Sequence, residues 1–259
     1  MTTTAILSAL AEEQQGLLAL LQDPRPVQRA GREFWVGALN GRNVVLGLSR
    51  IGKVAAATTA TALIEAFAVD RIVFTGVAGA VGAGVHVGDL VVATHFVQHD
   101  MDASPLFPRF EVPLYRQAQF SCDAELTGLL FEASRHCLDT AARRTADGPA
   151  PAVHQGLIAS GDSFIATAPA SAALKRALQS AGMAPLAVEM EGAAVAQVCH
   201  DYGVPFAAVR TISDRADEHA PMDFQRFVAD VAGAYALRIV ERLLATLPLD
   251  PGADRAGPT

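Results

Sequence analysis

The chain has 259 residues, of which 51% are hydrophobic and 18% are charged, and its formal net charge is −7 with a pI near 5.5. This length and apolar content suit one large α/β domain with a substantial core. The acidic balance argues against a nucleic-acid or anionic-membrane surface, because binding to phosphates needs clustered Lys and Arg. We therefore expect a small-molecule partner, with no nucleic acid and no membrane.

The N-terminus and the cysteines predict a cytoplasmic protein. No basic segment precedes the short apolar run of the N-terminal MTTTAILSAL, and no apolar stretch of about 18 residues is present to span a bilayer. Cys122, Cys137 and Cys199 are widely spaced, without a CxxC motif or a Cys/His cluster at zinc spacing. We expect them to be free thiols in a reducing compartment.

Strand and helix signals alternate in the first hundred residues. Residues 5–10 are a short apolar run, and the leucines that follow suit an amphipathic helix that ends at Asp23-Pro24-Arg25-Pro26. Asn40-Gly41 is a strong hairpin signal between strands at 34–39 and 43–49. The next segments are, in order, an Ala-rich helix at 52–67, a strand at 71–75 closed by Gly76-Val77-Ala78-Gly79, and a strand at 90–97.

The alternation continues after an irregular loop at 100–121. The expected elements are, in order, a helix at 122–144, a Pro/Gly break at 145–152, a strand at 155–160, a helix at 170–181, a strand at 186–188, a helix at 192–202, a strand at 206–212 and a long helix at 223–247. In the last of these, apolar residues recur mostly every three or four positions. Residues 248–259 are expected to form a disordered tail.

This alternation predicts one α/β domain over residues 1–247, with a mixed central sheet and helices on both faces in a three-layer α/β/α arrangement. In such sheets ligands bind at the carboxyl ends of strands, where helices begin. Several informative residues each follow a predicted strand: Glu13, Gly76–Gly79, Gly161–Phe164, Glu191 and Asp214.

Three acidic groups and one arginine fall within 26 positions, in segments that otherwise look like buried core: Glu189, Glu191, Arg210 and Asp214. Burying a carboxylate without a partner costs several kcal/mol. A sequence tolerates that where carboxylates bind hydroxyls or move protons. We interpret the segment as part of a pocket for a ribose and a purine, in which the bond between them is cut.

Each of these residues also has a structural interpretation. Desolvation should raise the pKa of Asp214 and make it a proton donor, but Ser213-Asp214 also has the chemistry of a helix cap. Glu13 could take a proton from water or stabilise the first turn of a helix. Glu191 could accept from two ribose hydroxyls, whereas Glu189 is interpreted as an ion-pair partner.

Arg210 lies inside an apolar strand and needs an acidic partner, for which Glu191 or Glu13 is the expected candidate. A structural salt bridge and a catalytic contact fit it equally well. Phe164 and Phe224 could stack on a base or belong to the core.

Two further segments resemble known motifs only superficially. The glycines at 76–84 fit neither a dinucleotide-binding pattern nor a Walker A motif, and we expect them to allow close approach of the backbone to a sugar or base. His99-Asp100-Met101-Asp102 lacks further spaced metal ligands, so a loop or interface role is favoured and no metal or cofactor is expected.

Seven segments, taken in order, resemble the 5′-methylthioadenosine/S-adenosylhomocysteine nucleosidases, which belong to the nucleoside phosphorylase superfamily. They span roughly residues 4–247 and lie at 9–13, 51–56, 75–79, 99–102, 160–165, 188–191 and 212–214. The resemblance implies a nucleoside phosphorylase-like α/β fold, a homodimer and no cofactor. It also implies hydrolysis of the N-glycosidic bond of methylthioadenosine and S-adenosylhomocysteine, with release of adenine.

The resemblance implies a role for each matching residue. Asp214 would protonate N7 of adenine and Glu13 would activate water, with Arg210 close to that water. The substrate-binding positions that it implies are Glu191 and Met190 at the ribose, Ser213 beside the acid, Phe164 stacked on adenine, the Ile165 backbone at the adenine edge, Phe224 at the 5′ substituent, and Val77 and Ile51 nearby.

Three positions depart from the family pattern. Val77 stands where the nucleosidases usually carry Ser, Leu10 replaces Met, and Arg50 stands where Gly is expected. A guanidinium at position 50 could hold phosphate, so a phosphate-dependent nucleoside phosphorylase is the first alternative. Drift at Val77 and Arg50 suggests a non-catalytic nucleoside-binding module as the second. The largely apolar loop at 103–112 suits a non-phosphorylated 5′ group.

Overall fold

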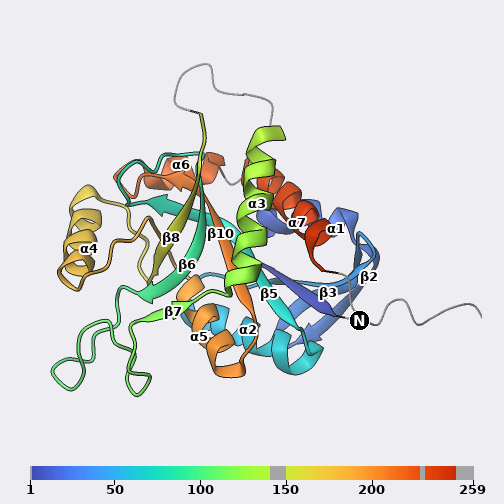
Figure 1. The fold of residues 1–259 in the computed structure, drawn as a ribbon, viewed down its shortest axis with the longest axis horizontal. Coiled ribbons are helices and arrows are strands. Elements are labelled where there is room, and N and C mark those ends of the chain that lie inside the picture. The colour runs from blue at the N-terminus through green and yellow to red at the C-terminus, as the bar shows by residue number, and fades with distance from the viewer. Residues whose placement is uncertain (1, 141–149, 228–230, 249–259) are drawn as a thin grey trace, which may run out of the picture.

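The computed structural model describes residues 2–140, 150–227 and 231–248. Helices and strands alternate along the chain (Figure 1). The strands are β1 (Thr3–Ser8), β2 (Gln22–Arg29), β3 (Arg32–Leu39), β4 (Arg42–Leu48), β5 (Arg71–Ala80), β6 (Leu90–Gln98), β7 (Gln119–Ser121), β8 (Val153–Ser160), β9 (Ala187–Glu189) and β10 (Phe206–Asp214). The helices are α1 (Ala11–Leu20), α2 (Lys53–Phe67), α3 (Ala124–Thr140), α4 (Ala168–Ser180), α5 (Gly192–Tyr202), α6 (Ala220–Phe227) and α7 (Gly233–Thr246).

The strands form one mixed sheet in the order β10-β6-β8-β9-β5-β1-β4-β3-β2, with β7 paired to β6. The sheet contains both parallel pairs, such as β1 with β5, and antiparallel pairs, such as β6 with β10. Because β10 also pairs with β5, the strands β5, β10, β6, β8 and β9 close into a ring. The predicted mixed α/β fold is confirmed, and the closure of its centre is a feature that alternation alone does not predict.

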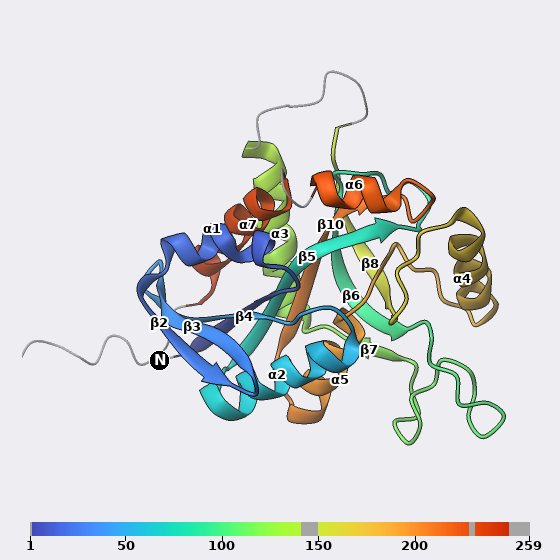
Figure 2. The ribbon, with the colours of Figure 1, turned by 180° about the vertical axis from the view of Figure 1, so that it is seen from behind.

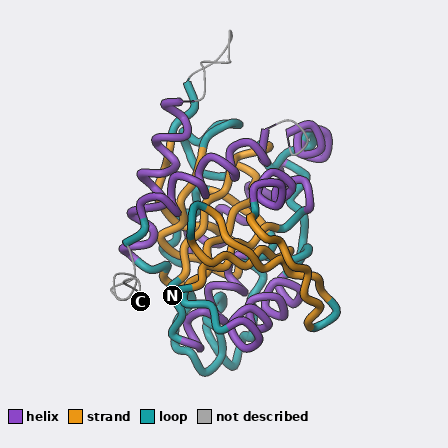
Figure 3. Tube along the Cα trace, turned by 90° about the vertical axis from the view of Figure 1, so that its right-hand side faces the viewer, coloured by secondary structure: helices purple, strands orange, loops and turns teal. Residues whose placement is uncertain are grey.

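Helices cover both sides of the sheet. Helices α1, α3 and α7 pack together on one side, and α2 packs against α5 on the other (Figures 1 and 2). The strands lie between these two groups when the molecule is seen from the side (Figure 3). Each group buries its own apolar cluster against the sheet, and burial of this area is the main favourable term in folding.

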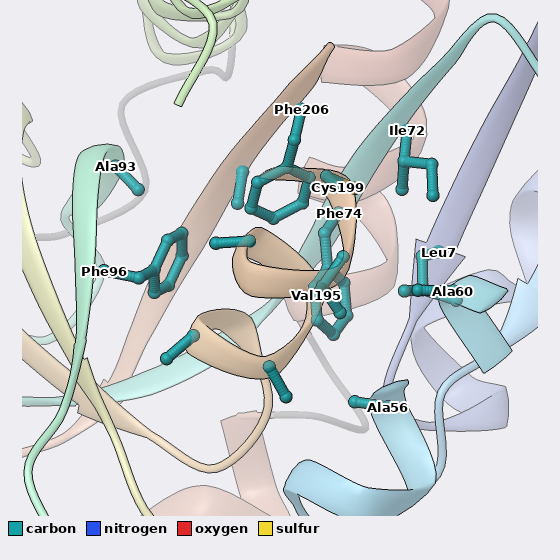
Figure 4. Close-up of a cluster of buried hydrophobic side chains, with 14 of the residues drawn as sticks. Leu7, Ala56, Ala60, Ile72, Phe74, Ala93, Phe96, Val195, Cys199 and Phe206 are labelled. Carbon is teal, nitrogen blue, oxygen red and sulfur yellow. The ribbon is translucent and has the colours of Figure 1, made fainter. Parts of the chain in front are cut away.

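The cluster under α2 and α5 shows why small residues occupy these helices. Figure 4 shows Phe96 and Phe206 from the sheet beside Val195 of α5, and the two rings lie 5.8 Å apart. At the first residue of α5, a Cβ on Gly192 would lie 2.1 Å from the ring of Phe96. Gly192 therefore serves close helix–sheet packing, and it is not among the residues that line the cavity described below.

Several predicted elements are confirmed. The hairpin turns at Asn40-Gly41, with Leu39 paired to Arg42. Helices α2 and α5 cover the predicted segments almost residue for residue. Most of the predicted tail at 248–259 and of the predicted break at 145–152 lies outside the described residues, so these two predictions stay open.

Four predictions of secondary structure are wrong. The last residues of the expected irregular loop at 100–121 form strand β7, which pairs with β6. Strand β5 continues to Ala80, so Gly76–Gly79 lie inside it instead of closing it. Residues 22–29 form a strand despite two prolines, which is possible because β2 is the edge of the sheet, where no neighbour needs the missing N–H groups. In the described residues the expected single helix at 223–247 is represented by two helices, α6 and α7, and residues 228–230 between them lie outside the description.

No helix within the described ranges is both long and apolar enough to cross a membrane.

Candidate active site

All the site residues predicted from the sequence line one cavity of about 420 Å³. They come from α1, from β5 and β10, from the segments that follow β4, β8 and β9, and from α6, which lies above the arrowhead of β5 in Figure 2. The full lining is Ala9, Leu10, Glu13, Ile51, Gly76, Val77, Ala78, Gly79, Ser163, Phe164, Ile165, Val188, Glu189, Met190, Glu191, Arg210, Ser213, Asp214, Pro221 and Phe224.

These residues do not meet at one edge of the sheet, as the sequence led us to expect. Strand β9 runs parallel to β8 but antiparallel to β5, and it overlaps only the last two residues of β5. The carboxyl ends of β8 and β9 therefore face those of β5 and β10 across the ring. The cavity lies where the two sets of strand ends meet.

Glu13 is the third residue of α1 and is 1% exposed. Its Oε2 atom accepts hydrogen bonds from the backbone N–H groups of Ala9 (2.8 Å) and Leu10 (3.0 Å). Its Oε1 atom is buried without a hydrogen-bond partner in the described structure. The backbone of Val77 lies close enough to Glu13 to favour the charged form of its carboxyl group, but it does not form a hydrogen bond of normal geometry with it.

Burial raises the pKa of Glu13, although the hydrogen bonds at Leu10 and Ala9 and the charge of Arg210 act in the opposite direction. Glu13 thus does stabilise its helix start, and in addition it presents a free oxygen to the cavity.

Asp214 is the last residue of β10 and is 2% exposed. Its Oδ1 accepts from the Ala216 N–H and its Oδ2 from the Ser213 hydroxyl, both at 2.8 Å. Burial raises the pKa of Asp214, and it outweighs these two hydrogen bonds, which favour the charged form. Gly79 faces the carboxyl group closely, since a Cβ there would lie 2.8 Å from Oδ1.

Arg210 is paired with Glu189, and neither Glu191 nor Glu13 is its partner as expected from the sequence. Its Nη2 atom donates to Glu189 Oε2 at 2.8 Å, and both side chains are almost fully buried. The guanidinium carbon lies 3.9 Å from the centre of the Phe74 ring. Glu189 can hold this pair because it also accepts from the Ser160 hydroxyl and from the Gly192 N–H. The structural ion-pair role proposed for Glu189 is thus observed.

Glu191 lies beside this ion pair, at the start of α5. Its Oε1 accepts from the Gly52 N–H at 2.9 Å. Burial, together with the nearby charge of Glu189, raises the pKa of Glu191 to about 8. The raised pKa favours the protonated form, in which Glu191 can donate as well as accept a hydrogen bond.

We predict that Glu191 makes the stability of the protein fall as the pH rises. Because its pKa is about 8 in the folded protein and 4.5 when unperturbed, the folded state binds this proton more tightly. The resulting stabilisation is fully present below pH 4.5 and is lost as the pH rises through about 8. Thermal unfolding measured across this range should show a shallower fall for Glu191→Gln than for the wild type. The exposed Glu12→Gln is the control and should keep the wild-type slope.

The opposite wall of the cavity is apolar. Phe164 and Phe224 pack edge to face, with ring centres 5.9 Å apart and planes at 74°. Phe164 is still 47% exposed, so part of its ring is free to cover a ligand. Ile51, Met190 and Val77 continue this surface. A flat aromatic ring such as a purine can pack on this apolar surface, against the exposed part of the Phe164 ring.

Two positions singled out in the sequence do not reach the cavity. The Arg50 guanidinium donates to the Gly31 carbonyl at 2.8 Å, and Arg50 is not among the lining residues. The apolar loop at 103–112 contributes no residue to the described lining either.

The sequence interpretation missed Pro221, which lines the cavity but carries no chemical signal in the sequence. Among the described residues, no group of three or more His, Cys, Asp and Glu side chains could hold a metal ion.

Comparison with known proteins identifies the family. Residues 3–245 match the family model described as the phosphorylase superfamily. The chain is 38% identical over 244 residues to the 5′-methylthioadenosine/S-adenosylhomocysteine nucleosidase of Actinobacillus succinogenes, covering 93% of this chain and 98% of the relative. The chain belongs to the 5′-methylthioadenosine/S-adenosylhomocysteine nucleosidase family of the phosphorylase superfamily.

Solved structures of this nucleosidase family share the fold. An S-adenosylhomocysteine nucleosidase from Streptococcus pyogenes, in complex with 5-methylthiotubericidin, superposes with a TM-score of 0.83 at 33% identity, covering 96% of this chain and 98% of that one. The futalosine hydrolase of Helicobacter pylori superposes with a TM-score of 0.82 at 31% identity, covering 95% and 98%. Solved structures named as nucleosidases and as a futalosine hydrolase thus share this fold.

Proposed function

We propose that this protein hydrolyses the N-glycosidic bond of 5′-thio-substituted adenosines, namely 5′-methylthioadenosine and S-adenosylhomocysteine, and releases adenine. The observation that carries the proposal is that Glu13 and Asp214, two buried carboxyl groups with raised pKa values, line the same cavity. One can act as base and the other as acid on a bond held between them. The names of the relatives agree with this chemistry.

In the proposed reaction, Asp214 gives its proton to N7 of adenine. Protonation makes adenine a neutral leaving group, and electrons of the C1′–N9 bond move onto the base. Burial favours the protonated form of Asp214, which is the form required. The Ser213 hydroxyl, 2.8 Å from Oδ2, fixes the orientation of the carboxyl group.

Glu13 prepares the water that attacks C1′. The Oε1 atom of Glu13, which has no hydrogen-bond partner in the described structure, accepts a proton from the water. The water oxygen forms a bond to C1′ at the same time. Gly76 leaves room for this water, since a Cβ there would lie 3.4 Å from Glu13 Oε1 and 3.5 Å from Arg210 Nη1. Arg210 is proposed to lie close to this water. The water thus loses one proton to Glu13, and adenine gains one proton from Asp214, so the protons of the hydrolysis balance.

The ribose becomes positively charged in the transition state, as in other glycosidic cleavage. A carboxylate close to the ring stabilises this charge more in the transition state than in the bound substrate. Glu191 is the group proposed to grip the ribose hydroxyls, with Met190 beside the sugar. Phe164 is proposed to stack on adenine, the Ile165 backbone to contact its edge, and Phe224 to contact the 5′ substituent.

Phosphorolysis and binding without turnover gain no support from the site. The Arg50 guanidinium, which motivated a phosphorylase, bonds to Gly31 outside the cavity. The acid and the base that catalysis needs both line the cavity, which disfavours a binding module without activity.

An assay for free adenine tests the proposed function. We expect wild-type protein to release adenine from 5′-methylthioadenosine in phosphate-free buffer, with no change when phosphate is added. Arg50→Gly should keep kcat within about twofold, as expected for a surface change. The backbone should accept this substitution, because Arg50 has a φ of 61°, a conformation that favours glycine. Strict dependence on phosphate, lost in Arg50→Gly, would instead establish a phosphorylase.

We also propose that the protein is a cytoplasmic homodimer. Leu106 and Leu114, 84% and 86% exposed, lie on the loops that project between β6 and β7 (Figure 1). Exposed apolar residues of this size favour burial against another chain. The free thiols of Cys122, Cys137 and Cys199 suit a reducing compartment. Sedimentation velocity tests the assembly, and a monomer at micromolar concentration would reject it.

A further inference from the structure

A polar cluster outside the cavity joins three segments that are distant in the sequence. Lys53, at the start of α2, forms an ion pair with Asp100, which follows β6. The second oxygen of Asp100 accepts from the backbone N–H of Asp162, after β8, at 2.9 Å. The Asp162 side chain in turn accepts from the backbone N–H of Lys53 at 2.8 Å. These contacts form a closed loop, because each residue is bonded to both of the others.

Two of the joined segments continue directly into the cavity. Gly52, next to Lys53, donates its N–H to Glu191, the carboxyl group proposed to bind the ribose. The residues that follow Asp162 are Ser163, Phe164 and Ile165, and all three line the cavity. The cluster therefore connects the backbone behind the proposed sugar contact with the backbone behind the proposed base contact.

The ring of the neighbouring His99 packs against the segment that contains Asp162. Its ring is packed so closely under Gly161 that a Cβ on that residue would lie 2.2 Å from Nε2. The Nε2 atom is buried and has no hydrogen-bond partner in the described part of the chain. The ring thus contributes packing, and the hydrogen bonds that fix the segment come from Asp100 and Lys53.

Asp100 is the centre of the cluster, since it uses both oxygens on different segments. Burial alone would raise the pKa of Asp100, but the hydrogen bonds from Lys53 and from the Asp162 N–H outweigh it and hold the pKa below its ordinary value. The charged form is therefore the one that the cluster stabilises. Isolated ion pairs at a surface contribute little, but a pair that also fixes a backbone N–H orders the chain to which it is bonded.

We propose that Lys53 and Asp100 are positioning residues for substrate binding: through Asp162 they hold residues 161–165 in the conformation in which Phe164 and Ile165 receive the base. The inference rests on the proposed function for the identity of the base. It assigns a role to the His99–Asp102 segment that the catalytic groups do not require. A preorganised wall binds substrate without paying to order the loop at each encounter.

The decisive comparison is Asp100→Asn against Asp102→Asn. Both variants make the same chemical change in one segment, but in the part of the chain that the structure describes the Asp102 side chain contacts Ser104 and Arg109, within its own loop. An Asn at position 100 cannot accept at both atoms, so it loses either the Asp162 N–H or the Lys53 contact. We expect Asp100→Asn to raise KM for 5′-methylthioadenosine about tenfold while kcat changes little, and Asp102→Asn to leave both unchanged.

Lys53→Met provides an independent second variant, and the double variant tests whether the residues act together. Because both act through one network, Lys53→Met combined with Asp100→Asn should raise KM no more than the worse single variant. Additive effects of the two changes would contradict a shared network.

Hydrogen exchange separates this inference from the proposed function. Amides of residues 161–165 should exchange faster in Asp100→Asn and Lys53→Met than in the wild type and in Asp102→Asn, with no substrate present. Calorimetry with adenine alone should show the matching loss of affinity. If the wild type released no adenine, the proposed function would fail while these two measurements still tested the positioning role. Equal exchange in Asp100→Asn and Asp102→Asn would overturn the role.

Discussion

Replacing Asp214 with Asn is expected to lower kcat for adenine release by about 10²–10⁴-fold, the usual contribution of a general acid. An Asn can still accept from the Ala216 N–H through its oxygen, so the end of β10 should keep its shape. What is lost is the proton for N7 of adenine. Steady-state kinetics with 5′-methylthioadenosine measure the effect, and thermal unfolding verifies that the variant is folded.

Asp217→Asn is the matched control for this prediction. Asp217 belongs to a neighbouring hollow and does not line the cavity, but its charge helps to raise the pKa of Asp214. Removing that charge should therefore lower the pKa of Asp214 and move the alkaline limb of the kcat profile to lower pH, without abolishing activity. An Asp214→Asn variant that retained wild-type kcat would show that another group protonates the base.

Replacing Glu189 with Gln is expected to reduce the free energy of unfolding by about 3–5 kcal/mol, the typical cost of removing one partner of a buried ion pair. Arg210 is 1% exposed, and Glu189 is the acidic side chain within ion-pair distance of it in the described structure. Glu189 also accepts from the N–H groups of Glu191 and Gly192, so the turn into α5 would lose its charge-assisted hydrogen bonds. Urea denaturation measures the loss.

The exposed pair of Arg135 and Glu132 provides the control. Glu132→Gln removes the same charge at a solvated site, where an ion pair contributes about 0–1 kcal/mol. A second measurement follows from the position of Glu189: without its negative charge, the pKa of Glu191 should fall from about 8. Equal stability losses for the two variants would contradict the buried ion pair.

From the sequence, the residues of the site could be predicted better than the contacts between them. Asp214, Glu13 and Glu191 stood out because carboxylates are rare in apolar segments, and this signal is local. The sequence did not reveal which acid pairs with Arg210. Glu189 and Glu191 are two residues apart, and the choice between them depends on how β9 overlaps β5 and β8.

The prediction of secondary structure from the sequence was wrong where tertiary contacts outweigh the local preference of the residues. The two prolines of β2 argue against a strand, but an edge position tolerates them. Gly76–Gly79 look like a loop, but they extend β5 because β10 pairs beside them, and Gly79 is required by its contact with Asp214.

By itself, the sequence determined the alternation of strands and helices, the hairpin at Asn40-Gly41 and the chemical groups of the site, because all of these depend on residue type and short spacing. Only the tertiary structure decided that the strands close into a ring, that Glu189 neutralises Arg210, and that Lys53 and Asp100 meet Asp162. Such contacts join residues far apart in the chain, and their partners are selected by the register and direction of strands, which no local pattern encodes.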